Sequence, residues 1–177
     1  LNTTKLHVLI RPRGGDFLYS DTEMKTMLKD IEMACQLGVD GFVIGCLTAD
    51  GNIDIPLMRK LMEKTEGKPV TFHRAFDMCR DPFKALDDIS LLGCKRILTS
   101  GQQNTAETGI PLLQDLLKRS GNDIIIMPGC GINSGNIAKI ALETGAREFH
   151  FSARTTFQSA MNYRNPSVSM GGTVHID

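Results

Sequence analysis

Thr71-Phe72-His73-Arg74-Ala75-Phe76-Asp77 is the stretch that decides the fold class predicted for this chain. Turn-forming Gly67 and Pro69 precede it, so it is predicted to open as a short buried strand, Val70–Arg74. The strand ends on three ionisable side chains, those of His73, Arg74 and Asp77. Such groups at the carboxyl ends of buried parallel strands are typical of ligand sites. A solvated loop is the alternative, and the close spacing of the three residues favours the site.

Apolar, strand-like runs of the same kind recur about every 24 to 34 residues, the length of a strand plus a crossover helix. Six strands are predicted, beginning at His7, Gly41, Val70, Arg96, Ile124 and Glu148. Helical spacing of apolar residues predicts helices after a cap at Ser20, over 54–66, from Asp81, over 105–119 and over 133–144. Because Pro111 lies inside the fourth helix, its start is expected nearer Gly109. Gly38, Gly93 and Gly145 are placed to end three of the helices in the left-handed conformation.

This alternation predicts an α/β fold with an all-parallel sheet. A polar loop follows almost every strand, and in a (β/α)8 barrel all these loops meet at one face. Neither a GxGxxG motif nor a phosphate-binding P-loop is present, so no nucleotide cofactor is expected. A closed barrel needs eight strands. We therefore predict one domain over 1–177, an incomplete TIM-type barrel in which two of the eight strands and the closing helix are missing, with 161–177 as a polar tail.

Composition limits the partners. Lys+Arg and Asp+Glu both number 20, so charge gives no case for nucleic acid or an anionic membrane surface. No apolar run reaches membrane-spanning length, and 1–5 do not resemble a secretory signal. The five cysteines are odd in number and form no CxxC pair, which indicates reduced thiols in a cytoplasmic protein.

Several long blocks resemble the signature blocks of the CutC copper-homeostasis family. They are Ile10–Ser20 (IRPRGGDFLYS), Thr71–Asp77, Ile97–Gly101 (ILTSG), Met127–Gly129 (MPG) and Glu148–Arg154 (EFHFSAR). The resemblance implies a cytosolic TIM-type barrel that forms dimers or larger oligomers and is linked to copper. The family's first two strands would precede residue 1, and the cysteines proposed to hold copper belong to that part. Cys130 also stands where the family's loop usually has a third glycine.

Anion-binding candidates follow several strands. Arg11 and Arg13 are suited to clamp a carboxylate or phosphate, or instead pair with Asp16 or Asp77 to fix loops. The backbone of Gly129-Cys130-Gly131 is suited to cradle an anion before a helix, or is merely a tight turn. The full set of candidates is Arg11, Arg13, Asp16, Arg74, Ser100, Gly129, Gly131 and Ser152.

Candidates for proton transfer are His73, Asp77 and His150. Alternation puts Glu148, His150 and Ser152 on one face and two phenylalanines on the other. An inward Glu148 must be paired or protonated, and Arg96, at the start of another strand, is a candidate partner. His150 is either an acid–base group or a hydrogen-bonded core histidine.

For copper, the candidates are the thiols of Cys46, Cys79 and Cys130, all in loops after strands. None has the short spacing of a ligand pair, and packing residues are the alternative. Cys35 and Cys94 are expected in the core.

Three functions remain open. The first is copper binding or handling, with copper implied by the resemblance alone. The second is a barrel enzyme acting on a small anionic metabolite, and the third is a truncated isoform that is inactive or depends on a partner. Convergent Arg, His and Asp would favour the anion, and convergent thiols would favour copper. Unpaired sheet edges also predict that the 177-residue chain is not a stable monomer by itself: it should associate, aggregate or be a fragment of a longer protein that completes the barrel.

Overall fold

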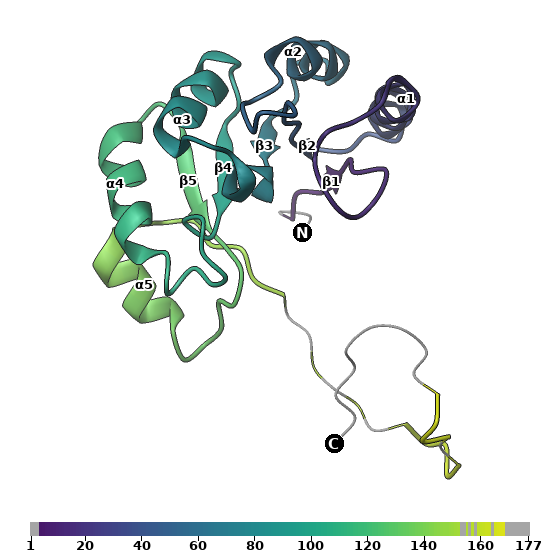
Figure 1. Ribbon diagram of the computed structural model, residues 1–177, viewed down its shortest axis with the longest axis vertical. Helices are drawn as coiled ribbons and strands as arrows, with labels where there is room; N and C mark the ends of the chain where they lie inside the picture. The colour runs from purple at the N-terminus through teal and green to yellow at the C-terminus, as the bar shows by residue number, and fades with distance from the viewer. Residues whose placement is uncertain (1–3, 153–154, 156, 158, 164, 169–177) are drawn as a thin grey trace.

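The computed structural model describes residues 4–152, 155, 157, 159–163 and 165–168. One parallel sheet of five strands runs through this part, in the order β1-β2-β3-β4-β5. The strands are β1 (His7–Leu9), β2 (Gly41–Ile44), β3 (Val70–Phe72), β4 (Arg96–Thr99) and β5 (Ile125–Pro128). Each strand pairs with the next one in the chain, and the sheet curves without closing (Figure 1). The α/β fold and the partial barrel predicted from the sequence are therefore confirmed.

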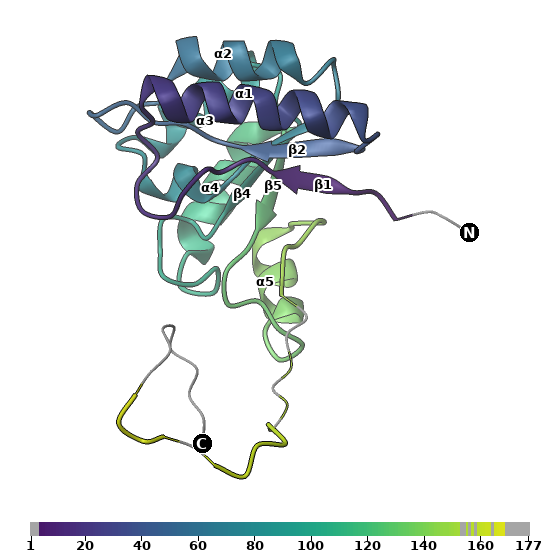
Figure 2. The ribbon, with the colours of Figure 1, turned by 90° about the vertical axis from the view of Figure 1, so that its right-hand side faces the viewer.

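All five α-helices lie on the convex side of the sheet (Figures 1 and 2). They are α1 (Asp21–Gln36), α2 (Ile55–Lys64), α3 (Pro82–Leu91), α4 (Ile110–Ser120) and α5 (Ile137–Thr144). A short 3-10 helix, η1 (Arg74–Met78), follows β3 directly and was not predicted. It turns the chain within the stretch that carries the ionisable residues.

The predicted helix ends are found where the local chemistry puts them. At the start of α1, the Ser20 hydroxyl accepts from the Glu23 N–H and the Glu23 carboxylate accepts from the Ser20 N–H at 2.8 Å. Asp54 and Asp81 cap α2 and α3 with their side chains. The three glycines predicted to end helices, Gly38, Gly93 and Gly145, all have positive φ and follow α1, α3 and α5.

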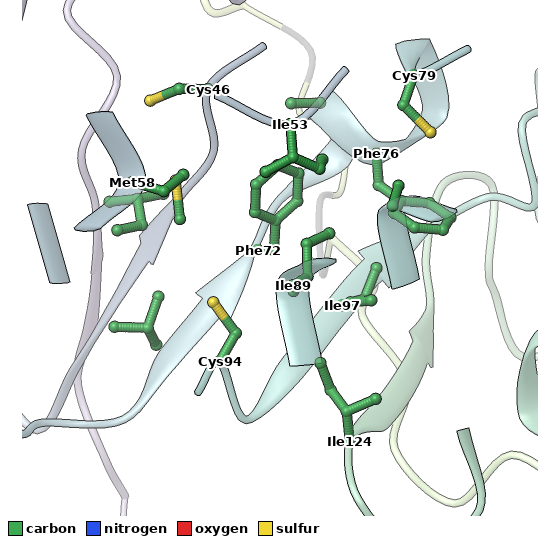
Figure 3. Close-up of a cluster of buried hydrophobic side chains, with 14 of the residues drawn as sticks. Cys46, Ile53, Met58, Phe72, Phe76, Cys79, Ile89, Cys94, Ile97 and Ile124 are labelled. Carbon is green, nitrogen blue, oxygen red and sulfur yellow. The ribbon is translucent and has the colours of Figure 1, made fainter. Parts of the chain in front are cut away.

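The hydrophobic core lies between the sheet and these helices. On the strands, Phe42, Phe72 and Ile97 have no exposed area. Figure 3 shows Phe72 and Ile97 packed with Ile89 of α3. Burial of these apolar faces is the main source of stability in such a layer.

The concave face of the sheet is less completely covered. Leu9, Val43, Thr71, Arg96 and Ile125 occupy one row across the five strands. Thr71 in the centre is buried, whereas Leu9 and Ile125 at the two ends are 56% and 38% exposed. The two edge strands, β1 and β5, thus carry apolar side chains in contact with water.

The prediction of a sixth strand was wrong. At 148–151 the chain makes a single parallel bridge, between Gly129 and His150, where the His150 N–H donates to Pro128 O at 2.9 Å. No further strand flanks this segment in the described part, so its ladder cannot extend. Phe149 packs against the core as expected, but Phe151 is 56% exposed.

The structure refines the predicted starts of two helices and the predicted polar tail. The start of α4 follows Gly109, as expected, but α5 begins later than predicted because 133–136 form a turn in which the Asn133 N–H donates to Asn136 Oδ1 at 2.8 Å. Of the predicted polar tail, 161–163 and 165–168 are described and exposed, and the rest lies outside the described residues. Within the described part, no helix has the length and apolar character needed to span a membrane.

Candidate functional site

Asp77 connects two loops at the carboxyl end of the sheet. Its Oδ1 accepts from the N–H groups of Ser100 at 3.0 Å and Gln102 at 3.1 Å, both in the loop after β4. Its Oδ2 accepts from Arg74 Nε at 2.7 Å. The carboxylate is 6% exposed. Because both oxygens already accept hydrogen bonds, Asp77 is placed to hold the loop and to position Arg74.

Arg74 is fixed but remains partly open to solvent. Besides its bond to Asp77, its Nη2 donates to the Ser100 hydroxyl at 3.1 Å. The side chain is nevertheless 42% exposed, and Nη1 has no partner among the described residues. Ser100 itself is fully buried, and its hydroxyl is held between Arg74 and Asp77. The structure thus brings Arg74, Asp77 and Ser100 together.

Arg11 and His73 are joined through an aromatic ring. The Arg11 guanidinium lies 4.6 Å from the centre of the Phe17 ring, which in turn lies 5.0 Å from the His73 ring. One Arg11 nitrogen, Nη2, donates to Gly15 O at 2.7 Å. Phe17 thus connects the loop after β1 with His73, which follows β3.

Arg13 fixes a loop and pairs with Asp16, which was the alternative to anion binding in the sequence analysis. Its Nε donates to Glu23 at 2.5 Å, and its Nη2 donates to Asp16 Oδ1 at 2.8 Å and to Leu18 O at 2.7 Å. The bond to Asp16 raises the pKa of Arg13 and lowers that of Asp16. With its donors used inside the loop, Arg13 is not free to bind a ligand in this conformation.

His73 is a neutral and deeply buried side chain, 5% exposed. Burial lowers its pKa to about 4. Its Nδ1 accepts from the Ala75 N–H at 3.1 Å. Gly45 allows this fit, because a Cβ there would lie 2.6 Å from His73 Nδ1. In a neutral imidazole whose Nδ1 accepts, the proton resides on Nε2, so His73 presents a donor.

Tyr19 is a neighbour that sequence reasoning missed. Its ring lies 5.4 Å from the Arg13 guanidinium, and its hydroxyl is buried. Burial raises the pKa of Tyr19, while the charge of Arg11 opposes the rise. The signal was present in the sequence, because Phe17 and Tyr19 lie in the same loop as Arg11 and Arg13.

The remaining candidates lie beside β5. The Gly129 backbone approaches Leu98 and His150 so closely that a Cβ at Gly129 would clash with Leu98 at 2.4 Å. His150 and Ser152 are exposed. Cys130 and Gly131 both have positive φ, which makes 129–131 a tight turn. Within the described part, no hydrogen bond or ion pair joins this group to Arg74 or His73.

The candidate thiols do not converge. Figure 3 shows Cys46 and Cys79 apart, with Ile53 and Phe76 between them. Burial raises the pKa of Cys79 to about 12 and that of Cys46 further still. Cys130 Sγ lies 3.1 Å from Asn104 O, in a different loop. Among the described residues, no three His, Cys, Asp or Glu side chains gather as a metal site.

A cavity of about 670 Å³ opens at the other end of the sheet, between α4, β5 and α5. Its lining includes Leu117, Ile124, Thr144 and Arg147, at the amino end of β5. Glu148, which also lines it, is held by Arg96, whose Nη2 donates to Oε1 at 3.2 Å. None of the predicted site residues lies in this cavity.

Comparison with known proteins identifies relatives. The CutC family matches residues 1–155. A CutC family protein of Bacteroides thetaiotaomicron is 67% identical over 177 residues, which are 100% of this chain and 71% of that protein. A human protein named copper homeostasis protein cutC homolog is 50% identical over 167 residues, 94% of this chain and 61% of its own length.

Solved structures agree with the fold. The crystal structure of CutC from Streptococcus agalactiae matches with a TM-score of 0.80 at 37% identity, covering 82% of this chain and 71% of that one. An aldolase matches with a TM-score of 0.66 at 14% identity, covering 84% of this chain and 68% of its own. At that identity the second match concerns the fold alone.

Proposed function

This chain belongs to the CutC family, and on that premise we propose that it binds a small anionic metabolite, a carboxylate or a phosphate, at the carboxyl ends of its strands. The observation that carries the proposal is the position of Arg74. Its guanidinium is held by Asp77 and Ser100, its Nη1 has no partner among the described residues, and the side chain is 42% exposed at the carboxyl end of the sheet. Guanidinium groups bind carboxylates and phosphates through paired N–H donors.

Preorganisation supports this reading. Much of the cost of binding is the ordering of long side chains, and the Arg74 side chain is already ordered by Asp77. Arg11 adds a second cation that is exposed and anchored to the same surface by Gly15 and Phe17. Two anchored cations at the carboxyl ends of β1 and β3 match a small anion better than a soft metal ion.

Copper handling is the second candidate, and the name of the human relative favours it. Cu(I) prefers thiolate and thioether ligands. Cys46 and Cys79 would have to lose their thiol protons to bind Cu(I), and burial opposes this because it raises the pKa of both thiols. The half-buried Cys130 is therefore the thiol we would test first.

Isothermal titration of the 177-residue chain with inorganic phosphate and with pyruvate tests the proposal. We expect Arg74→Met and Arg11→Met each to weaken binding about tenfold, the value of a charge-assisted hydrogen bond. Arg59→Met, which removes an exposed arginine of α2, is the matched control and should bind within about twofold of the original chain. Absence of binding, or equal binding by all three variants, would overturn the proposal. Two arginine variants are used because Arg74→Met also removes a partner of Asp77.

A further inference from the structure

Two buried polar atoms have no hydrogen-bond partner within the described part of the chain. They are the hydroxyl oxygen of Tyr19 and Nε2 of His73. Buried donors and acceptors are almost always paired, because an unpaired one forfeits its bonds to water without replacing them. Tyr19 follows β1 and His73 follows β3, so both atoms belong to residues at the carboxyl end of the sheet, and they call for a functional explanation.

Both atoms are donors at neutral pH. His73 Nδ1 accepts from the Ala75 N–H at 3.1 Å, so the single proton of the neutral ring is on Nε2. Nε2 therefore donates and cannot accept a proton. Tyr19 keeps its hydroxyl proton because burial raises its pKa.

Arg11 is the neighbour that the two share. Its guanidinium stacks on Phe17 at 4.6 Å, and Phe17 contacts His73 with the ring centres 5.0 Å apart. The charge of Arg11 also acts on the pKa of both Tyr19 and His73. Arg11, which follows β1, is thus the charged group that acts on both donors.

We propose that Tyr19 and His73 form a pair of neutral donors for a carbonyl oxygen of the ligand, and that the bound anion is therefore a small oxo acid. This inference rests on the proposed function, since Arg11 would take the negative charge. A carbonyl oxygen on C2 has two lone pairs and can accept from both donors while Arg11 binds the carboxylate, whereas an acid with no oxygen on C2 leaves both donors unpaired. Because both donor atoms are closed to water, the exposed side chain of Arg11 is expected to move when the ligand enters.

The test compares three acids of nearly the same shape by isothermal titration of the full 177-residue chain. Propionate has no oxygen on C2, lactate has a hydroxyl and pyruvate has a carbonyl. We expect pyruvate to bind about tenfold more tightly than propionate, as two ordinary hydrogen bonds would give, with lactate between them. In Tyr19→Phe and in His73→Leu the ratio of pyruvate affinity to propionate affinity should shrink at least threefold.

Tyr163→Phe, which removes the exposed tyrosine hydroxyl of the chain, is the matched control and should keep the preference. Thermal unfolding checks that the variants fold, and Tyr19→Phe, which deletes one unpaired oxygen, should not lower the midpoint. If no acid binds, the proposed function and this inference both fail. Equal binding of the three acids, or a preference that survives in Tyr19→Phe, overturns this inference alone.

Discussion

Asp77 and Ser100 are joined by two hydrogen bonds across neighbouring loops. The Ser100 N–H donates to Asp77 Oδ1 at 3.0 Å, and its hydroxyl lies 3.1 Å from Oδ2. The Gln102 N–H adds a bond at 3.1 Å. The buried carboxylate of Asp77 thus orders the loop after β4 and fixes Arg74. The geometry of the carboxyl end of the sheet therefore depends on Asp77.

Replacing this carboxylate by an amide should destabilise the fold. In Asp77→Asn one acceptor oxygen becomes an NH₂ group that faces N–H donors. We expect a loss of about 2–3 kcal/mol in the free energy of unfolding, the cost of unpaired buried groups. Urea unfolding at pH 7 measures it. Asp87→Asn is the control, because Asp87 and Arg119 are each about half exposed, at 49% and 51%, and such pairs contribute under about 1 kcal/mol. Equal losses in both variants would contradict the role given to Asp77.

The burial of His73 should make stability depend on pH. As pH falls through 6.5, the unfolded chain binds a proton at this residue, whereas the folded chain, whose His73 pKa is about 4, does not. Stability from this source is therefore complete above pH 6.5 and is lost as pH falls towards 4. Between pH 7 and pH 5 the loss should be about 2 kcal/mol, at about 1.4 kcal/mol per pH unit.

His73→Gln isolates this contribution, because glutamine does not titrate. Urea unfolding at pH 7 and pH 5 should show a loss about 2 kcal/mol smaller in the variant than in the original chain. His7, whose pKa is also lowered, is present in both and cancels. The same pH slope in both proteins would mean that His73 titrates normally.

Copper should bind this chain weakly. The thiolate is the ligand that Cu(I) prefers, and burial raises the pKa of Cys79 to about 12 and that of Cys46 as well. Competition for Cu(I) with a chelator of known affinity measures the strength. Tight one-to-one binding that Cys130→Ser abolishes, and Cys35→Ser does not, would refute this and favour copper handling.

The 177-residue chain should associate in solution. Within the part of the chain that the structure describes, β1 pairs on one side only, and Leu9 on that edge is 56% exposed. An apolar edge with free backbone groups pairs readily with another chain. Unpaired buried groups cost about 1–3 kcal/mol each, and total stability is only about 5–15 kcal/mol. Sedimentation velocity at low micromolar concentration should show dimers or larger species. A uniform monomer with a cooperative thermal transition would show that the open sheet is stable by itself.

Local chemistry in the sequence predicted much of the fold. The capping box at Ser20 and Glu23 and the start of α4 after Gly109 follow from short-range rules, and the structure confirms them. The pairing of Glu148 with Arg96 was also predicted, because an inward carboxylate on a strand needs a cation. The sixth strand was not predictable in the same way, since a strand forms only where neighbours extend its ladder.

The site was less predictable than the fold. Sequence patterns placed Arg11 and Arg13 in one loop but could not show which of them uses its N–H donors to bind other residues of that loop. The path of the loop decides this, because it brings Asp16 and Glu23 to Arg13 and leaves Arg11 on Phe17. The tautomer of His73 likewise depends on the turn of η1, which presents the Ala75 N–H to the ring.

A crystal structure of the chain grown with pyruvate tests the central claim most directly. The account predicts a carboxylate bound by the side chains of Arg11 or Arg74, at the carboxyl ends of β1 and β3. An anion bound instead in the cavity between α4 and α5, beside Lys118 and Arg147, would contradict it.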